Sequence, residues 1–372
     1  MNPPVTCAYI DLDNLAFNFR NIRDAVSPAA VIAVVKADAY GHGALAVANR
    51  LAAEGAGMFA VARLGEALEL RDSGFLHPIL IFGRLFSKEI PAAIEAGFRI
   101  SVFCKEDIRW IESSLADLTA LVHVKVDTGM GRVGILWDRV GELFEALKIS
   151  RRCRLEGVYS HFSTSDEKDK TYATMQLTRF IDVLRELKKR RINPAMIHMA
   201  NSGAVLDLPA SRFDAVRPGI ILYGHYPSQE TSRSIELRQV MTLQTRVTHV
   251  RKLPKNFPIS YGRRHTTDKE ARIAVLPIGY ADGVRRDLTN RGRVLVGATR
   301  YPMVGTITMD QLMVEVDAAV SPGDKAIVWG DSGQGTIQAL EVAAAIGTIP
   351  YELTCGVGRR VKRVYVGRED GR

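Results

Sequence analysis

Residues 31–44, VIAVVKADAYGHGA, join a short apolar run to a lysine and two glycines. The first five residues are apolar and mostly β-branched, which is typical of a strand buried in a parallel sheet. Lys36 follows at the expected end of this strand, where an ammonium group is costly to bury unless it is paired or reacts. Loss of hydration lowers the pKa of such an amine, which favours Schiff-base formation. A lone lysine at a strand end more often extends its charge to water, so this stretch alone indicates only a candidate reactive lysine.

Short apolar runs alternate with amphipathic segments along the first part of the chain. The runs predict eight strands, at residues 31–35, 58–63, 78–82, 99–103, 120–126, 155–161, 195–199 and 213–217. The segments between them predict helices at 65–72, 87–96, 106–115, 139–149 and 171–191, and an earlier helix begins near Asp13. Strands separated by helices are typical of an α/β fold, the (β/α)8 TIM-type barrel. An open doubly wound sheet alternates in the same way, but no G-x-G-x-x-G motif follows the first strand to indicate a dinucleotide fold.

The rhythm changes at about residue 236, where short strands follow one another through turns. Strands are predicted at 240–250, 271–277, 292–296, 303–308, 312–316 and 325–329, with one helix at 337–346. We therefore expect residues 1–235 to form the barrel and residues 236–372 to form a mostly β C-terminal domain. The boundary is expected near the polar stretch 227–234.

The composition is that of an ordinary globular protein, with 47% hydrophobic and 24% charged residues. No apolar run approaches the roughly 20 residues of a membrane span, and the first residues show no secretory signal pattern. Cys7, Cys104, Cys153 and Cys355 are widely separated, which favours reduced thiols over a disulfide framework or a zinc site. We therefore expect a cytoplasmic protein that holds no metal. The formal net charge of +9 is spread along the chain, so neither a nucleic-acid nor a membrane partner is expected.

Polar residues follow the carboxyl ends of the later predicted strands, in segments 125–134, 160–162, 198–203 and 217–224. In a (β/α)8 barrel these ends converge on one face, where the active site lies. Taken singly, His161 and His198 are more often structural histidines, and Tyr223 is more often a core residue. Gathered at one face, the set predicts an active site at the mouth of the barrel.

The segment VVKADAYGHGA (residues 34–44) resembles the pyridoxal-phosphate lysine motif of the alanine racemases. The strand-end segments resemble the same family motif by motif, as do residues 259–262 and the run 279–311 in the second domain. The resemblance covers essentially the whole chain in order. It implies a fold-type III isomerase that uses pyridoxal 5'-phosphate to interconvert L-alanine and D-alanine, and a homodimer with shared active sites.

The resemblance implies two catalytic bases. Lys36 would hold the cofactor as a Schiff base (the internal aldimine) and, once substrate releases it, act as the base on one face of the α-carbon. Tyr261 of the partner subunit would act on the other face. Racemisation removes a proton from one face and returns one to the opposite face, so two bases are an economical design. The cofactor would be the electron sink.

The resemblance also implies the groups that surround the cofactor. Arg217 would face the pyridine nitrogen and disfavour its protonation by charge repulsion, and His161 would pack near the cofactor and position Arg217. The other cofactor-binding residues, most of them at the phosphate, would be Tyr40, Asn201, Ser202, Gly219, Ile220 and Tyr351.

Substrate binding is implied for the side chain of Arg132 and for the backbone N–H of Met309 of the partner subunit, both at the carboxylate. Lys125 matches a lysine that is carbamylated in some relatives, where it orients the arginine. Tyr280 and Asp310 match supporting positions in the second-domain block.

Other readings remain open. A racemase of another amino acid, such as serine or lysine, would share these motifs, because substrate preference depends on the shape of the pocket. A fold-type III amino-acid decarboxylase would be expected to show a G-x-G-G-G phosphate loop, which this sequence lacks. A non-catalytic pyridoxal-phosphate carrier would need the barrel but neither the β domain nor Tyr261. D-Alanine could be made for the cell wall or consumed in catabolism.

Overall fold

The computed structural model describes residues 4–114 and 118–367. Eight parallel strands form its larger unit: β2 (Ala30–Val34), β3 (Met58–Val61), β4 (Ile79–Ile81), β5 (Arg99–Val102), β6 (Ala120–Asp127), β8 (Cys153–Tyr159), β9 (Met196–His198) and β10 (Ala215–Val216). The sheet closes because β5 pairs with both β4 and β6, and β10 pairs with both β9 and β2. The predicted (β/α)8 barrel is thereby confirmed, with each strand within a few residues of its expected position.

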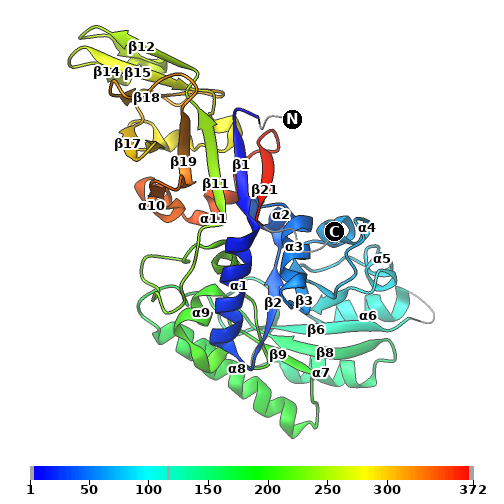
Figure 1. Ribbon diagram of the computed structural model, residues 1–372. Helices are drawn as coiled ribbons and strands as arrows, with labels where there is room; N and C mark the ends of the chain where they lie inside the picture. The colour runs from blue at the N-terminus through cyan, green and yellow to red at the C-terminus, as the bar shows by residue number, and fades with distance from the viewer. Residues whose placement is uncertain (1–3, 115–117, 368–372) are drawn as a thin grey trace.

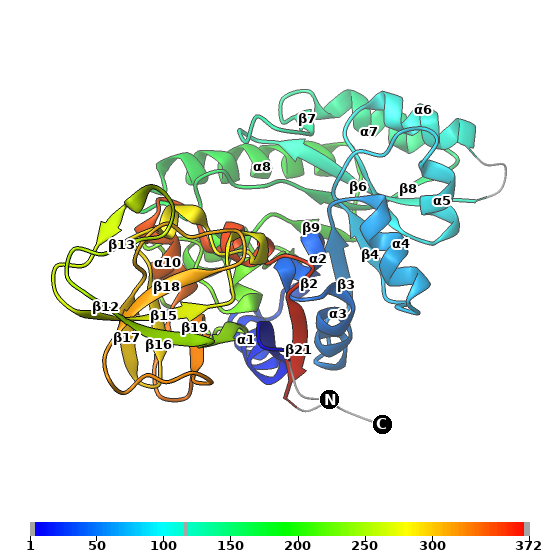
Figure 2. The same cartoon turned by 90° about the horizontal axis from the view of Figure 1, so that it is seen from above.

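Helices cover the outside of this barrel (Figure 2). They are α3 (Ala44–Ala53), α4 (Leu64–Asp72), α5 (Ile90–Glu95), α6 (Lys105–Ser114), α7 (Val140–Ile149), α8 (Thr171–Lys189) and α9 (Ser202–Asp207), with the short strand β7 (Ile135–Leu136) beside β6. Leu115, the last residue of the helix predicted at 106–115, lies outside the described residues. No helix in the described ranges combines the length and the apolar composition that crossing a membrane requires.

The chain enters the barrel through α1 (Leu12–Val26). The carboxylate of Asp11 accepts a hydrogen bond from the backbone N–H of Asn14, at 2.8 Å, so the helix begins slightly before the predicted Asp13. An N-cap of this kind satisfies an N–H group that has no partner within the helix. Leu15, Phe19 and Ile22 repeat at helical spacing on the buried face and attach α1 to the barrel.

The second unit is mostly β, as predicted. Its strands are β11 (Met241–Arg246), β12 (His249–Leu253), β13 (Pro258–Ile259), β14 (His265–Thr266), β15 (Ala271–Leu276), β16 (Arg293–Val296), β17 (Thr299–Pro302), β18 (Leu312–Val316), β19 (Lys325–Asp331), β20 (Thr336–Ile337) and β21 (Lys362–Val366). Its helices are α10 (Ala339–Ala345) and α11 (Pro350–Cys355). Short 3-10 turns interrupt both units: η1 (Pro209–Ser211), η2 (Ile220–Tyr223), η3 (Tyr261–Arg263), η4 (Tyr280–Asp282) and η5 (Arg286–Leu288).

Two of the predicted strands in this unit are wrong in detail. The single strand expected at 240–250 is divided between β11 and β12, which belong to different sheets. The strand expected at 303–308 is a loop in which only Met303 makes an isolated bridge, to Val314. The backbone of this loop forms hydrogen bonds with neighbouring loops instead of a strand. For example, the N–H of Ile307 donates to the hydroxyl of Thr289.

The first strand, β1 (Cys7–Asp11), belongs to the sheet of the C-terminal domain. It pairs antiparallel with β11 and parallel with β21, so residues from both ends of the chain share one sheet (Figure 1). The proposed division at residue 235 is therefore wrong for these residues. A strand's partners are set by long-range pairing, which the local apolar pattern of Cys7–Asp11 does not contain.

Candidate active site

A cavity of about 390 Å³ opens at the carboxyl ends of the barrel strands. Its wall includes Val34, the last residue of β2, and Tyr159, the last residue of β8. Most of the predicted site residues line this one cavity: Lys36, Tyr40, Lys125, Arg132, His161, Asn201, Ser202, Arg217, Gly219 and Tyr351. All but Tyr351 come from the barrel, whose parallel strands end on a common face. Tyr351 comes from α11 of the second unit.

Lys36 begins a short segment, α2 (Lys36–Gly41), that turns in the left-handed sense. The φ angles from Ala37 to Tyr40 lie between 53° and 55°, in a region that costs a non-glycine residue roughly 1–2 kcal/mol. Two carboxylates hold the turn: Glu66 accepts from the N–H of Ala37 at 2.6 Å, and Asp38 accepts from the N–H of Ala44 at 2.7 Å. The turn sends Lys36 and Tyr40 into the same cavity.

The electrostatic environment of Lys36 favours the neutral amine. Burial lowers the pKa of Lys36 first, and the positive charge of Arg132 lowers it further. Its Nζ atom lies 6.0 Å from the centre of the Tyr40 ring. An amine of this kind is a competent nucleophile toward a carbonyl carbon and a competent base.

Tyr40, Ser202 and Gly219 form a small cradle in the wall of the cavity. The hydroxyl of Ser202 accepts a hydrogen bond from the N–H of Gly219 at 2.9 Å. A Cβ atom on residue 219 would lie 2.9 Å from Cζ of Tyr40 and closer still to its hydroxyl oxygen, so only glycine leaves this approach open. Ile220 is fully buried and starts η2 beside this cradle, but its side chain does not line the cavity. The hydroxyl donors of Tyr40 and Ser202 in such a cradle suit an anion.

Arg217 is buried at the floor of the cavity and is held by several acceptors. Its Nη1 atom lies 2.7 Å from Nδ1 of His198, and its Nη2 atom donates to the carbonyls of Ser160 at 2.5 Å and Met199 at 3.0 Å. His161, the expected positioning residue, lies 3.5 Å from Nη2, at the limit of a hydrogen bond. Burial lowers the pKa of Arg217 to about 10, so its guanidinium stays charged near neutral pH.

His198 was therefore missed as a site residue. The sequence places it at the end of a strand, which does not distinguish a histidine that binds Arg217 from one that packs in the core. The inward direction of its side chain is decided by the pairing of β9 with β8 and β10.

Lys125 and Arg132 form the cationic side of the cavity. Burial, followed by the charge of Arg217, lowers the pKa of Lys125 to about 7. Its Nζ atom donates to the carbonyl of Val126 at 3.1 Å. Arg132 stands on the loop after β6, which Asp127 holds by accepting from the N–H groups of Gly129 and Met130, both at 2.8 Å.

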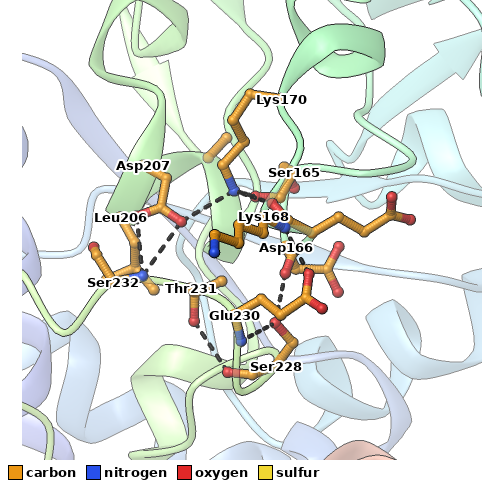
Figure 3. A network of polar contacts seen from close by, with 12 residues as sticks. Ser165, Asp166, Lys168, Lys170, Leu206, Asp207, Ser228, Glu230, Thr231 and Ser232 are labelled. Carbon is orange, nitrogen blue, oxygen red and sulfur yellow. Dashed lines mark hydrogen bonds and ion pairs between the residues drawn. The ribbon is translucent and has the colours of Figure 1, made fainter.

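A polar network fixes the loop between β8 and α8 (Figure 3). Nζ of Lys170 donates to the carbonyls of Ser165 at 2.7 Å and Glu167 at 2.5 Å and pairs with Asp207 at 3.1 Å. The hydroxyl of Ser165 in turn donates to Oδ1 of Asn201 at 2.6 Å.

The same network extends to the segment before the C-terminal domain. Asp207 also accepts from the N–H of Ser232 at 3.2 Å, and the hydroxyl of Ser228 donates to the carbonyl of Asp166 (Figure 3). Asn201, a predicted cofactor-binding residue, is thus held in place by groups that the sequence motifs did not identify.

Besides Ile220, four of the predicted residues lie outside this cavity. Tyr261, Met309 and Tyr280 have exposed fractions of 73%, 52% and 44%, and Asp310 is also exposed. Tyr261 and Asp310 line a second depression, on the C-terminal domain. The strand β14, which follows η3, lies at the end of that domain remote from the barrel (Figure 1). A single chain therefore does not bring Tyr261 to Lys36.

The loop that carries Tyr261 and the loop that carries Asp310 are each held firmly. The carbonyl of Tyr261 accepts from the hydroxyl of Thr306 at 2.7 Å. Asp310 accepts from Arg360 at 2.8 Å, and Arg360 also pairs with Asp282 at 2.6 Å. These residues are exposed at the surface and yet well ordered by their neighbours.

Both units match known protein families. Residues 10–227 match the alanine racemase N-terminal domain, and residues 240–365 match the alanine racemase C-terminal domain. An alanine racemase of Carboxydothermus hydrogenoformans is 42% identical over 364 residues, which cover 96% of this chain and 99% of that protein.

Solved structures agree over the same length. Alanine racemase of Clostridium difficile 630 superposes with a TM-score of 0.92 at 38% identity, covering 98% of this chain and 96% of that one. A histidine racemase of Leuconostoc mesenteroides superposes with a TM-score of 0.90 at 26% identity, covering 98% of each chain. The chain therefore belongs to the alanine racemase family, a family of isomerases that use pyridoxal phosphate.

Proposed function

We propose that this protein interconverts L-alanine and D-alanine with pyridoxal phosphate held by Lys36. The observation that carries the proposal is the composition of one cavity, which joins a buried amine, a buried arginine and an anion cradle. The names of its relatives support alanine as the substrate. Racemisation needs an amine to hold the cofactor and a base beside the α-carbon, and Lys36 meets both needs.

The residues of the cavity fit the cofactor. The cradle of Tyr40, Ser202 and Gly219 offers two hydroxyl donors to a phosphate, in a space that a Cβ on residue 219 would fill. Ile220, Asn201 and Tyr351 border this cradle and complete the proposed binding set. When bound, pyridoxal phosphate supplies the electron sink for the charge left at the α-carbon.

Arg217 is the proposed partner of the pyridine nitrogen. It is charged near neutral pH and buried, so it repels a proton from a neighbouring nitrogen. A nitrogen kept unprotonated withdraws less charge from the α-carbon, which favours rapid return of the proton over side reactions. His161, at the edge of the cavity and 3.5 Å from Arg217, is the proposed packing neighbour of the ring.

The second base is proposed to come from another copy of the chain. Tyr261 is exposed and lies on the C-terminal domain, so it reaches a cavity like that of Lys36 only in a partner subunit. A homodimer with two shared sites would use the depression around Tyr261 as part of its interface. Tyr280, Met309 and Asp310 lie on the same domain, and the N–H of Met309 is proposed to bind the carboxylate of the substrate.

Arg132 is the proposed partner of the same carboxylate within the subunit. Lys125, whose pKa of about 7 leaves much of it neutral near neutral pH, is proposed to react with CO2 and form a carbamate. The amine nitrogen forms the new bond to carbon and releases one proton. The product is an anion next to Arg132, which it would orient.

Another amino acid is the second candidate substrate. A histidine racemase shares the fold at a TM-score of 0.90, so the scaffold does not by itself restrict the side chain of the substrate. The unpaired thiols of Cys7, Cys104, Cys153 and Cys355 support a cytoplasmic location. The reaction would supply D-alanine for the cell wall or consume it in catabolism.

The test is racemisation of a panel of L-amino acids by the purified protein with added pyridoxal phosphate, measured by chiral chromatography. We expect rapid conversion of L-alanine and slow conversion of serine, lysine, arginine and histidine. Preference for one of the others would keep the reaction and change the substrate. Absence of racemisation with the cofactor bound would contradict the proposal and favour a decarboxylase or a cofactor carrier.

A further inference from the structure

We propose that His198, His123 and Glu156 form a directional chain of hydrogen bonds that positions Arg217 from the interior of the barrel. His123 and Glu156 are then positioning residues, which act on the cavity through His198 without touching it. The inference rests on the proposed function in one respect only, namely that Arg217 faces the pyridine nitrogen of the cofactor.

The chain of contacts is continuous. Nη1 of Arg217 lies 2.7 Å from Nδ1 of His198, and Nε2 of His198 lies 2.9 Å from Nδ1 of His123. Nε2 of His123 lies 2.9 Å from Oε2 of Glu156, which accepts from Nε of Arg99 at 3.2 Å. Every link falls within hydrogen-bonding distance, and both histidines are fully buried.

The route crosses the barrel from one end to the other. Arg217 follows β10, and His198 is the last residue of β9, at the carboxyl end of the strands. Glu156 lies in the middle of β8, and Arg99 is the first residue of β5, at the opposite end. The contacts thus connect the active-site mouth to a partly exposed ion pair at the far end of the barrel.

The barrel wall is shaped for this route. Residue 157 of β8 pairs with His123 of β6, and a Cβ atom there would lie 3.0 Å from Cγ of His123 and closer still to its Nδ1. Gly157 therefore provides the room in which the His123 ring turns toward His198. Tyr159, two residues later, stacks on the His198 ring at 4.9 Å with an interplanar angle of 3°. Both rings are thus held at a defined angle by strand β8.

Arg217 and Glu156, the two end members of the hydrogen-bond chain, give it its direction. An arginine can only donate hydrogen bonds, so Nδ1 of His198 must be an acceptor. A neutral His198 then carries its proton on Nε2 and donates to Nδ1 of His123. His123 must likewise carry its proton on Nε2 and donate to Glu156, which as a carboxylate can only accept.

The protonation states agree with this direction. Burial lowers the pKa of His198 well below its usual value, as does the charge of Arg217. Burial also lowers the pKa of His123, against the effect of its bond to Glu156. Burial raises the pKa of Glu156, but the hydrogen bonds from His123 and Arg99 outweigh it and lower the pKa to about 2. Two neutral histidines thus connect a cation to an anion.

The result is a defined orientation for Arg217. The acceptors described above engage Nη1 and Nη2, and among the described residues none accepts from its Nε–H. With its proton on Nδ1, His198 would direct an N–H at the guanidinium of Arg217, and the contact would become repulsive. With its proton on Nδ1, His123 would direct an N–H at the N–H of His198 and would face Glu156 with a bare Nε2. Glu156 excludes that tautomer, since its carboxylate has no proton to donate.

The first test reads the tautomers directly. The full-length protein is labelled with ¹⁵N-histidine, loaded with pyridoxal phosphate and examined by imidazole NMR from pH 6 to 9, with His123→Leu used for assignment. We expect both His123 and His198 to stay neutral over this range with the proton on Nε2. A signal from either residue that titrates in this range, or that carries the proton on Nδ1, would overturn the inference.

The second test separates positioning from general stability. In Glu156→Leu the acceptor is lost, while Glu156→Gln retains an amide oxygen that can accept from His123. We expect Glu156→Leu to lower kcat about tenfold with little change in KM, and Glu156→Gln to recover most of kcat and the wild-type tautomers. Equal kcat values in the two variants, with equal thermal unfolding midpoints, would contradict the role of Glu156.

Turnover is not needed for the NMR test. Wild-type protein that keeps the expected tautomers but racemises no amino acid would therefore support the hydrogen-bond chain and contradict only the proposed function. If Glu156→Leu does not fold, the wild-type NMR spectrum alone decides the direction of the chain.

Discussion

The ring of Tyr40 lies against the backbone of Gly219, where a Cβ atom on residue 219 would stand 2.9 Å from Cζ of Tyr40. The two residues come from opposite ends of the barrel sequence and meet because β2 pairs with β10. The ring of Tyr40 also packs against the ring of Tyr223, with the ring centres 4.9 Å apart and the planes tilted by 35°. Gly219 and Tyr223 thus hold the ring of Tyr40 in the cradle proposed for the phosphate.

Gly219→Ala should weaken binding of pyridoxal phosphate by at least about tenfold, because the added methyl group displaces Tyr40 from the cradle. The dissociation constant can be measured from the quenching of protein fluorescence. Gly65→Ala is the matched control, since a Cβ at that position in α4 meets no atom within 4 Å. Equal affinities of the two variants for pyridoxal phosphate would contradict the placement of its phosphate in this cradle.

Lys36→Ala should abolish the absorbance of the lysine-bound cofactor and lower racemisation by at least about 10³-fold, since both the covalent anchor and one base are lost. Absorbance spectra and chiral chromatography are the measurements. Lys168→Ala, which changes an exposed lysine on the loop of Figure 3, should leave both unchanged. Retained activity in Lys36→Ala would exclude Lys36 as the anchor.

Mixing two inactive variants tests whether subunits share their sites. Lys36→Ala lacks the first base and Tyr261→Ala the second, so a hybrid dimer has one site in which both residues are intact. We expect the mixture to recover up to about a quarter of wild-type activity, the share expected for random exchange between two equal pools. Subunit exchange is followed with differently labelled chains. Complete exchange without recovered activity would show that Tyr261 does not act on the partner's site.

The stability of the protein should depend on pH through Lys125. Its pKa is about 7 in the folded protein and 10.5 when exposed, so between these values the unfolded chain binds more protons. The contribution of Lys125 to the free energy of unfolding therefore rises with pH in this range, by up to about 1.4 kcal/mol per pH unit.

Urea denaturation of wild type and Lys125→Met at pH 7 and pH 9.5, in buffer free of CO2, measures this effect. We expect the stability of Lys125→Met relative to wild type to be larger at pH 7 and to shrink at pH 9.5. Lys168→Met, at an exposed site, controls for the loss of a positive charge. A difference that is independent of pH would contradict the lowered pKa.

Lys170→Met should loosen the loop between β8 and α8, because it removes the donor to Ser165, Glu167 and Asp207. We expect faster hydrogen exchange in residues 163–170 and about threefold to tenfold weaker cofactor binding, since Asn201 loses its support. Lys168→Met, on the same loop but exposed, is the matched control. Unchanged exchange in Lys170→Met would show that the loop is held without the lysine.

The barrel and its catalytic face follow from local patterns in the sequence. The apolar runs at β2, β3 and β4 identify strands because buried parallel strands require continuous apolar residues. Lys36 stands just after β2 and Arg217 just after β10, and a parallel barrel has only one face on which such residues can meet. The sequence by itself thus determined the architecture and the general location of the site.

Only the tertiary structure decided which groups contact one another. The left-handed turn from Ala37 to Tyr40 contradicts the intrinsic preference of these residues and exists because Glu66 and Asp38 hold it. His198 became the partner of Arg217, and Cys7–Asp11 joined the distant C-terminal sheet, through strand pairings across long stretches of chain. The physical reason is that periodicity and residue type report the environment of a residue, whereas contacts between distant residues depend on how the whole chain packs.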